Sequence, residues 1–171
     1  LDVKVGDGAF MKTIEDAREL SRRMVEIGNS VGRKTIAVLT NMEEPLGYSI
    51  GNANEIIEGI EALKGNWSND LKEVVYEIVY LALKHKGEVE TFEQASKIID
   101  NVIANGKALE LLKEFIELSG GNGEVVNNYS LLPTPKSVLE VYSNEEGYIT
   151  KIKAEEIGKA AMVIGAGRAT K

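Results

Sequence analysis

The chain has 171 residues, with 27 Asp and Glu against 20 Lys and Arg, and a formal net charge of −7. A surface that binds nucleic acid concentrates Lys and Arg, whereas the basic residues here are scattered among acids, which argues against a nucleic-acid partner. Cysteine is absent, which excludes disulfides, thiolate zinc sites and a cysteine nucleophile and accords with a reducing cytoplasm. No long apolar run suggests a membrane partner.

The first forty residues predict a strand, a helix and a second strand. Residues 1–5 are short and β-branched and precede a Gly-Asp-Gly segment at 6–8, which suits a strand that ends in a tight turn. Apolar residues recur at helical spacing over 14–31, and 35–40 is a second apolar run typical of a strand. This order predicts parallel strands in a βαβ unit. We expect an α/β fold of βαβ units with a mixed or parallel sheet and flanking helices.

Further helices and a hairpin are predicted in the rest of the chain. Apolar periodicity indicates helices at about residues 53–64, 71–81, 92–103 and 109–116. Residues 136–142 and 148–152 are typical of a β-hairpin, and 154–164 of a last short helix. We divide the chain into a central α/β segment, 1–135, expected to be incomplete at its N-terminus, and the start of a C-terminal β-rich portion, 136–171.

Two glycine-rich segments could bind an anion, but each also has a simpler interpretation. Gly6-Asp7-Gly8 follows a strand, where α/β sheets bind ligands, yet it lacks the third glycine of a dinucleotide motif. Gly165–Arg168 could cradle a phosphate with Arg168 as a clamp, or it could simply end a helix. His85 is the only histidine, and its place in a polar run at a helix end favours a solvated residue over a general base.

Glu55 and Glu58 lie one turn apart at the predicted helix that follows the loop 45–52. Loop carbonyls and a carboxylate together would form a hard-oxygen site for an alkali or alkaline-earth ion. Acidic residues are also common at helix N-termini without any ligand, because they complement the helix dipole. Spacing alone leaves both interpretations open.

The segment Asp-Val-Lys-Val-Gly-Asp-Gly-Ala-Phe-Met-Lys, at residues 2–12, resembles the central segment of pyrimidine-nucleoside phosphorylases and thymidine phosphorylases. Further matches follow in register, among them Asn41-Met42, Pro45-Leu46-Gly47, Gly51-Asn52-Ala53 and Ile157–Arg168. The resemblance covers essentially the whole chain. It implies that the chain is part of the large α/β domain of a nucleoside phosphorylase.

The resemblance also implies a reaction. That family catalyses reversible phosphorolysis, in which the co-substrate phosphate displaces the base of uridine, thymidine or deoxyuridine and yields free base and (deoxy)ribose 1-phosphate. It implies a pyrimidine nucleoside and phosphate as partners, a homodimer, a cytoplasmic location and no organic cofactor. No catalytic residue of the family falls within this chain, and the main phosphate- and base-binding segments lie outside it. We therefore expect the chain to be inactive alone.

The resemblance assigns a few site residues. Phe10 matches the position that lines the base pocket in the family, and Met11 lies beside it. The loop 45–52 and the following helix resemble the family's monovalent-cation site, often occupied by potassium. There Leu46 and Ser49 would offer carbonyl oxygens and Glu58 a carboxylate, with the remaining ligands outside this chain.

Two alternative functions remain open. One is a non-catalytic binding or dimerisation module derived from such an enzyme. The other is a related phosphoribosyltransferase, which would consume a pyrophosphorylated ribose with magnesium. The sequence also departs from the family pattern at Asn54, where an apolar residue is usual, and at Gly59, where Ala is usual.

Overall fold

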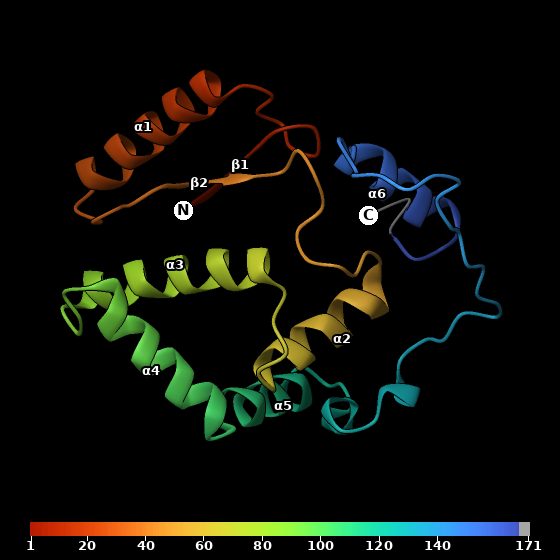
Figure 1. Ribbon diagram of the computed structural model, residues 1–171. Helices are drawn as coiled ribbons and strands as arrows, with labels where there is room; N and C mark the ends of the chain where they lie inside the picture. Colours follow the sequence, from red (N-terminus) through yellow and green to blue (C-terminus); the bar gives the residue numbers. More distant parts are fainter. Residues whose placement is uncertain (168–171) are drawn as a thin grey trace.

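The computed structural model describes residues 1–167, in which the predicted βαβ unit is confirmed (Figure 1). The strands β1 (Asp2–Val5) and β2 (Val38–Asn41) pair in parallel, and the helix α1 (Ile14–Ser30) connects them. The side chain of Thr13 accepts the N–H of Asp16 and so caps α1. β2 begins at residue 38 rather than 35, because its partner β1 is only four residues long.

Four helices follow where the apolar periodicity predicts them. They are α2 (Asn52–Leu63), α3 (Asn69–Lys86), α4 (Phe92–Ala104) and α5 (Lys107–Leu118). His85 is exposed in the last turn of α3, the position of a solvated residue that the sequence favours. Within residues 1–167, the helices are too short or too polar to cross a lipid bilayer.

The two-stranded sheet lies between α1 and α3 (Figure 1). α1 contacts both strands, and its residues Ala17 and Ser21 are buried. On the other face, a cavity of about 420 Å³ lies between Val38 of β2 and the α3 residues Ile78 and Leu81. One face of the sheet is therefore packed more closely than the other.

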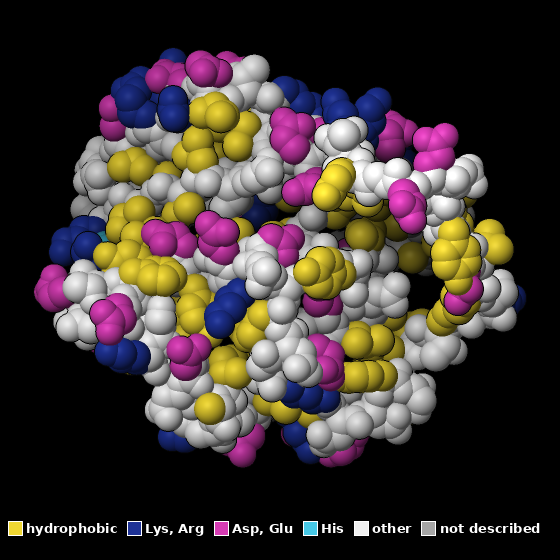
Figure 2. Space-filling model, in the orientation of Figure 1, with side chains coloured by type: hydrophobic (Ala, Val, Ile, Leu, Met, Phe, Trp, Pro, Cys, Tyr) yellow, Lys and Arg dark blue, Asp and Glu magenta, His cyan; other side chains and the backbone are white. Residues whose placement is uncertain are grey.

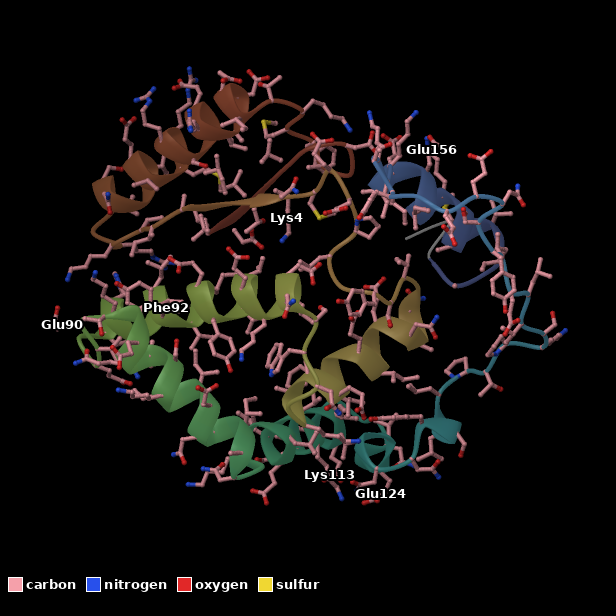
Figure 3. The ribbon with its side chains drawn as sticks, in the orientation of Figure 1. Lys4, Glu90, Phe92, Lys113, Glu124 and Glu156 are labelled. Carbon is pink, nitrogen blue, oxygen red and sulfur yellow. The ribbon has the colours of Figure 1, made fainter. Side chains whose placement is uncertain are left out.

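The main apolar core lies away from the sheet, between α2, α5 and the 3-10 turn η1 (Gly123–Val126). Ile60 of α2 is fully buried there against Val125 and Val126. Lys113 of α5 and Glu124 of η1 form an ion pair at the surface of this region (Figure 3). Partly buried side chains complete the core: Leu109, Leu112, Ile116, Tyr129 and Leu132.

After the 3-10 turn η2 (Tyr129–Leu131), the chain runs without helix or strand to α6 (Ala154–Val163), which confirms the last predicted helix. The hairpin predicted at 136–142 and 148–152 is wrong, because these residues form no strand. A lone hairpin needs another strand or a helix to cover one face. Ile152 is partly buried, but the other large apolar side chains here are at least 75% exposed: Val138, Leu139, Val141, Tyr142, Tyr148 and Ile149.

We predict that Ile60→Ala lowers the free energy of unfolding by about 2–5 kcal/mol, because it leaves a cavity in the main core. Ile56→Ala is the matched control on the same helix, since Ile56 is 50% exposed. It should cost less than about 1 kcal/mol. Urea unfolding followed by circular dichroism measures both, and equal losses would show that the contact of α2 with η1 is not the main core.

Candidate functional site

The candidate site lies at the carboxyl ends of β1 and β2, where parallel sheets bind ligands. The loop after β1 and the loop after β2 lie side by side, and the N–H of Gly8 donates to the carbonyl of Met42 (2.8 Å). α6 contacts both loops, since the N–H of Ala154 donates to the carbonyl of Glu43 (3.3 Å) and Ala154 also contacts Gly8. Three segments distant in sequence therefore build the site.

Gly6 and Gly8 allow the close approach of these segments. Gly6 has a φ of +128°, and a Cβ there would lie 2.6 Å from the backbone nitrogen of Glu43. A Cβ on Gly8 would lie 2.9 Å from the Cβ of Ala154. The N–H of Ala9 donates to the carbonyl of Gly6 (3.1 Å), which confirms the predicted tight turn of the Gly-Asp-Gly segment.

Phe10 and Met11 line one cavity of about 720 Å³ beside β1. Leu20 and Met24 of α1 form an apolar side of this cavity. The side chain of Phe10 is 99% exposed, so its position depends on the backbone of its loop. The N–H of Gly6 donates to the carbonyl of Met11 (2.9 Å) and closes that loop. An exposed aromatic ring at such a cavity can pack against a flat ligand ring.

The loop Pro45–Gly51 folds over Glu58 of α2. The carboxylate of Glu58 accepts hydrogen bonds from the N–H groups of Tyr48 (2.8 Å) and Ser49 (3.0 Å). Gly47 has a φ of +77°, and a Cβ there would lie only 2.6 Å from Oε2 of Glu58. Glu58 therefore lies against the loop 45–51, the loop with which the sequence analysis grouped it.

The oxygen atoms of Glu58 and of the loop backbone are of the kind that binds a hard cation. Carbonyl and carboxylate oxygens are hard ligands, which alkali and alkaline-earth ions prefer. Each oxygen of Glu58 accepts one N–H and keeps capacity for a further contact. Within residues 1–167 no three His, Cys, Asp or Glu side chains are grouped to hold a metal ion. Carbonyl oxygens such as those of Leu46 and Ser49 would therefore have to supply most of the ligands.

Two more carboxylates hold the same loop. Glu55 of α2 accepts the N–H of Gly51 (3.0 Å), and Asp70 of α3 accepts the N–H of Gly47 (2.8 Å). Partial burial raises the pKa of Asp70, but hydrogen bonds such as that from Gly47 lower it further, so its pKa lies below the ordinary value. Sequence reasoning missed Asp70, because no local pattern links it to a loop 23 residues earlier.

The two predicted groups of site residues lie at the same end of the sheet but do not share a cavity. Leu46 lines a separate cavity of about 320 Å³ between β2 and α3, away from Phe10. Gly165 follows α6 with a φ of +82°, which confirms its interpretation as a helix end. Arg168, the clamp in the alternative interpretation of that segment, lies outside the described residues.

Sequence comparison finds relatives along the whole chain, although no model of a known protein family matches it. The chain is 48% identical to the pyrimidine-nucleoside phosphorylase of Bacillus subtilis over 175 residues. It is 45% identical to that of Geobacillus stearothermophilus and 44% identical to that of Staphylococcus haemolyticus. Each match covers 100% of the chain, which spans about 40% of the length of these curated relatives. The chain is thus homologous, from end to end, to part of the pyrimidine-nucleoside phosphorylases.

We predict opposite effects of alanine at two glycines near the loop. Gly47→Ala should destabilise the chain by more than about 1 kcal/mol, because Cβ meets Glu58 and the positive φ is strained. Gly59→Ala should stabilise it by about 0.5–1 kcal/mol, since this α2 residue faces open space. Urea unfolding measures both variants. An undiminished stability of Gly47→Ala would contradict the fold of the loop over Glu58.

Proposed function

We propose that this chain is the central part of a pyrimidine-nucleoside phosphorylase. In the proposed reaction, phosphate displaces the base of uridine, thymidine or deoxyuridine and yields free base and (deoxy)ribose 1-phosphate. The observation that carries the proposal is 43–48% identity, over the whole chain, to proteins of that name. Residues 1–135 would then form a central α/β segment within the large α/β domain of that enzyme, and 136–171 would begin its C-terminal β-rich portion.

We assign Phe10 and Met11 to the pocket of the pyrimidine base. The exposed ring of Phe10 offers a flat apolar surface beside a cavity of about 720 Å³, a volume that suits a small ligand. Packing of the ring against the base would exclude water from one face of the pyrimidine, which strengthens polar contacts to the leaving base. The groups that bind phosphate would come from the rest of the enzyme.

We assign Leu46, Ser49 and Glu58 to a potassium site. A bound potassium ion would supply a positive charge that holds the carbonyls of the loop and the carboxylate of α2 together. The support is the fold of the loop over Glu58 and the close approach of the two that Gly47 allows. The role of these residues would be to fix the loop after β2 at the end of the sheet.

Assembly and location follow from the same proposal. We propose that the intact enzyme acts as a homodimer in the cytoplasm, with a nucleoside and phosphate as its small-molecule partners and no organic cofactor. The contacts within the dimer would involve surfaces beyond the candidate site described above.

The polypeptide encoded by the whole reading frame should release uracil from uridine only when phosphate is present. The 171-residue chain alone should release none. Chromatography of the base and of ribose 1-phosphate measures the reaction. Consumption of phosphoribosyl pyrophosphate with magnesium would instead identify a phosphoribosyltransferase, and no turnover in either assay would favour a non-catalytic module.

Glu58→Gln in that longer polypeptide should raise the potassium concentration needed for half-maximal activity by at least about ten-fold, since the site loses its charged ligand. Glu55→Gln is the matched control, because Glu55 lies on the same helix and accepts an N–H of the same loop. It should leave the potassium requirement within about two-fold of the unaltered enzyme. Equal shifts in both variants would argue against Glu58 as a ligand.

A further inference from the structure

Three residues connect the start of α6 to the loop that carries Phe10. Oδ2 of Asp7 accepts the backbone N–H of Glu155 (3.0 Å). Nζ of Lys12 donates to the carbonyl of Asp7 (2.6 Å) and lies 3.6 Å from the carboxylate of Glu155. We call Asp7, Lys12 and Glu155 the α6 latch. All three also line the cavity of Phe10 and Met11.

The loop needs support from such contacts because its aromatic residue has little packing. Phe10 is 99% exposed, so the packing of its own side chain does not fix its place. Backbone hydrogen bonds tie the loop to itself and to Met42. Asp7 and Lys12 add side-chain contacts to a third element, α6, at the two ends of the turn that holds Phe10.

α6 needs an acceptor from elsewhere as well. Its N-cap residue is Lys153, which makes no side-chain hydrogen bond to the helix start. A lysine has no acceptor atom, so the first N–H groups of the helix must find another partner. The carbonyl of Glu43 accepts the N–H of Ala154, and Asp7 accepts the N–H of Glu155, 148 residues later, with a negative charge that is favourable at a helix N-terminus. The next residue, Glu156, points outward from the helix (Figure 3).

We infer that Asp7 is a positioning residue of the nucleoside site: by capping α6 it holds the loop 6–12 in the conformation that presents Phe10 to the cavity. The identity of the ligand rests on the proposed function, whereas the coupling of the loop to α6 does not. Phe10 would contact the base before and during the reaction. Loss of the latch should therefore raise the KM for the nucleoside and leave kcat nearly unchanged.

Amide hydrogen exchange of the 171-residue chain, without any ligand, tests the coupling. In Asp7→Ala, exchange should become about five-fold faster at Glu155 and also at residues 8–12, because the cap is lost. Asp7→Asn keeps an acceptor oxygen and should stay within about two-fold of the unaltered chain. Glu15→Ala, at an exposed acid in the first turn of α1, is the control and should change neither segment.

A second variant keeps the test decisive if Asp7→Ala fails to fold. Lys12→Met removes the other two contacts of the latch and leaves Asp7 in place, and exchange at residues 8–12 should rise about two-fold. Faster exchange confined to Glu155 in Asp7→Ala, or exchange at residues 8–12 that is no faster in Lys12→Met than in the Glu15→Ala control, would overturn the inference.

Kinetics of the longer polypeptide then test the consequence for the site. Asp7→Ala should raise the KM for uridine about three- to ten-fold with kcat within about two-fold, and Asp7→Asn should restore the KM. A fall in kcat at unchanged KM would overturn the positioning role. Because hydrogen exchange needs no substrate, a lack of phosphorolysis in the unaltered enzyme would refute the proposed function alone and leave the latch to be judged by exchange.

Discussion

The parallel pairing of β1 with β2 determines where the functional loops of this chain lie. The register runs from Asp2 opposite Val38 to Val5 opposite Asn41, so both strands end at the same edge. The loop of Phe10 and the loop over Glu58 therefore start next to each other, although a whole helix separates them in sequence. Only four residues of each strand pair, and beyond them the two loops stay in contact because Gly6 lies close to the backbone of Glu43.

The helices could be predicted from the sequence because apolar periodicity is a local property. α2 and α5, for example, begin and end within a few residues of the predicted bounds, and both pack apolar side chains in the core around Ile60. The hairpin at 136–152 could not be predicted in the same way. Its β-branched and aromatic residues favour a strand, but a strand forms only where another element covers one face, and Tyr148 is 99% exposed.

The candidate site was predictable only in part. Phe10 and Glu58 were identified through the family resemblance, since spacing alone left a surface role open for the acids of α2. The contacts of Asp70 with Gly47 and of Asp7 with Glu155 join residues 23 and 148 positions apart. In the sequence each acid belongs to a helix start or a turn, and only the tertiary fold shows which N–H group it accepts.

Much of the apolar surface of this chain is exposed. Polar contacts, rather than packing, therefore hold most of the site in place. Among residues 1–167 Ile60 is the largest side chain that is fully buried, whereas Leu111, Phe115 and Leu118 form an exposed face of α5. Figure 2 shows hydrophobic side chains spread over the visible surface. Contiguous exposed apolar residues mark interaction surfaces. Such surfaces are what a segment of a longer enzyme would need in order to pack against the rest of it.

The small size of the buried core also determines how the two loops of the site are held. A small core cannot fix Phe10 or the loop over Glu58 by packing, so their geometry depends on glycines that allow close approach and on carboxylates that accept backbone N–H groups. Such contacts are directional but individually weak. It follows that substitutions at Asp7, Gly47 or Asp70 would act first on the shape of the site, whereas a substitution at Ile60 would act on the whole fold.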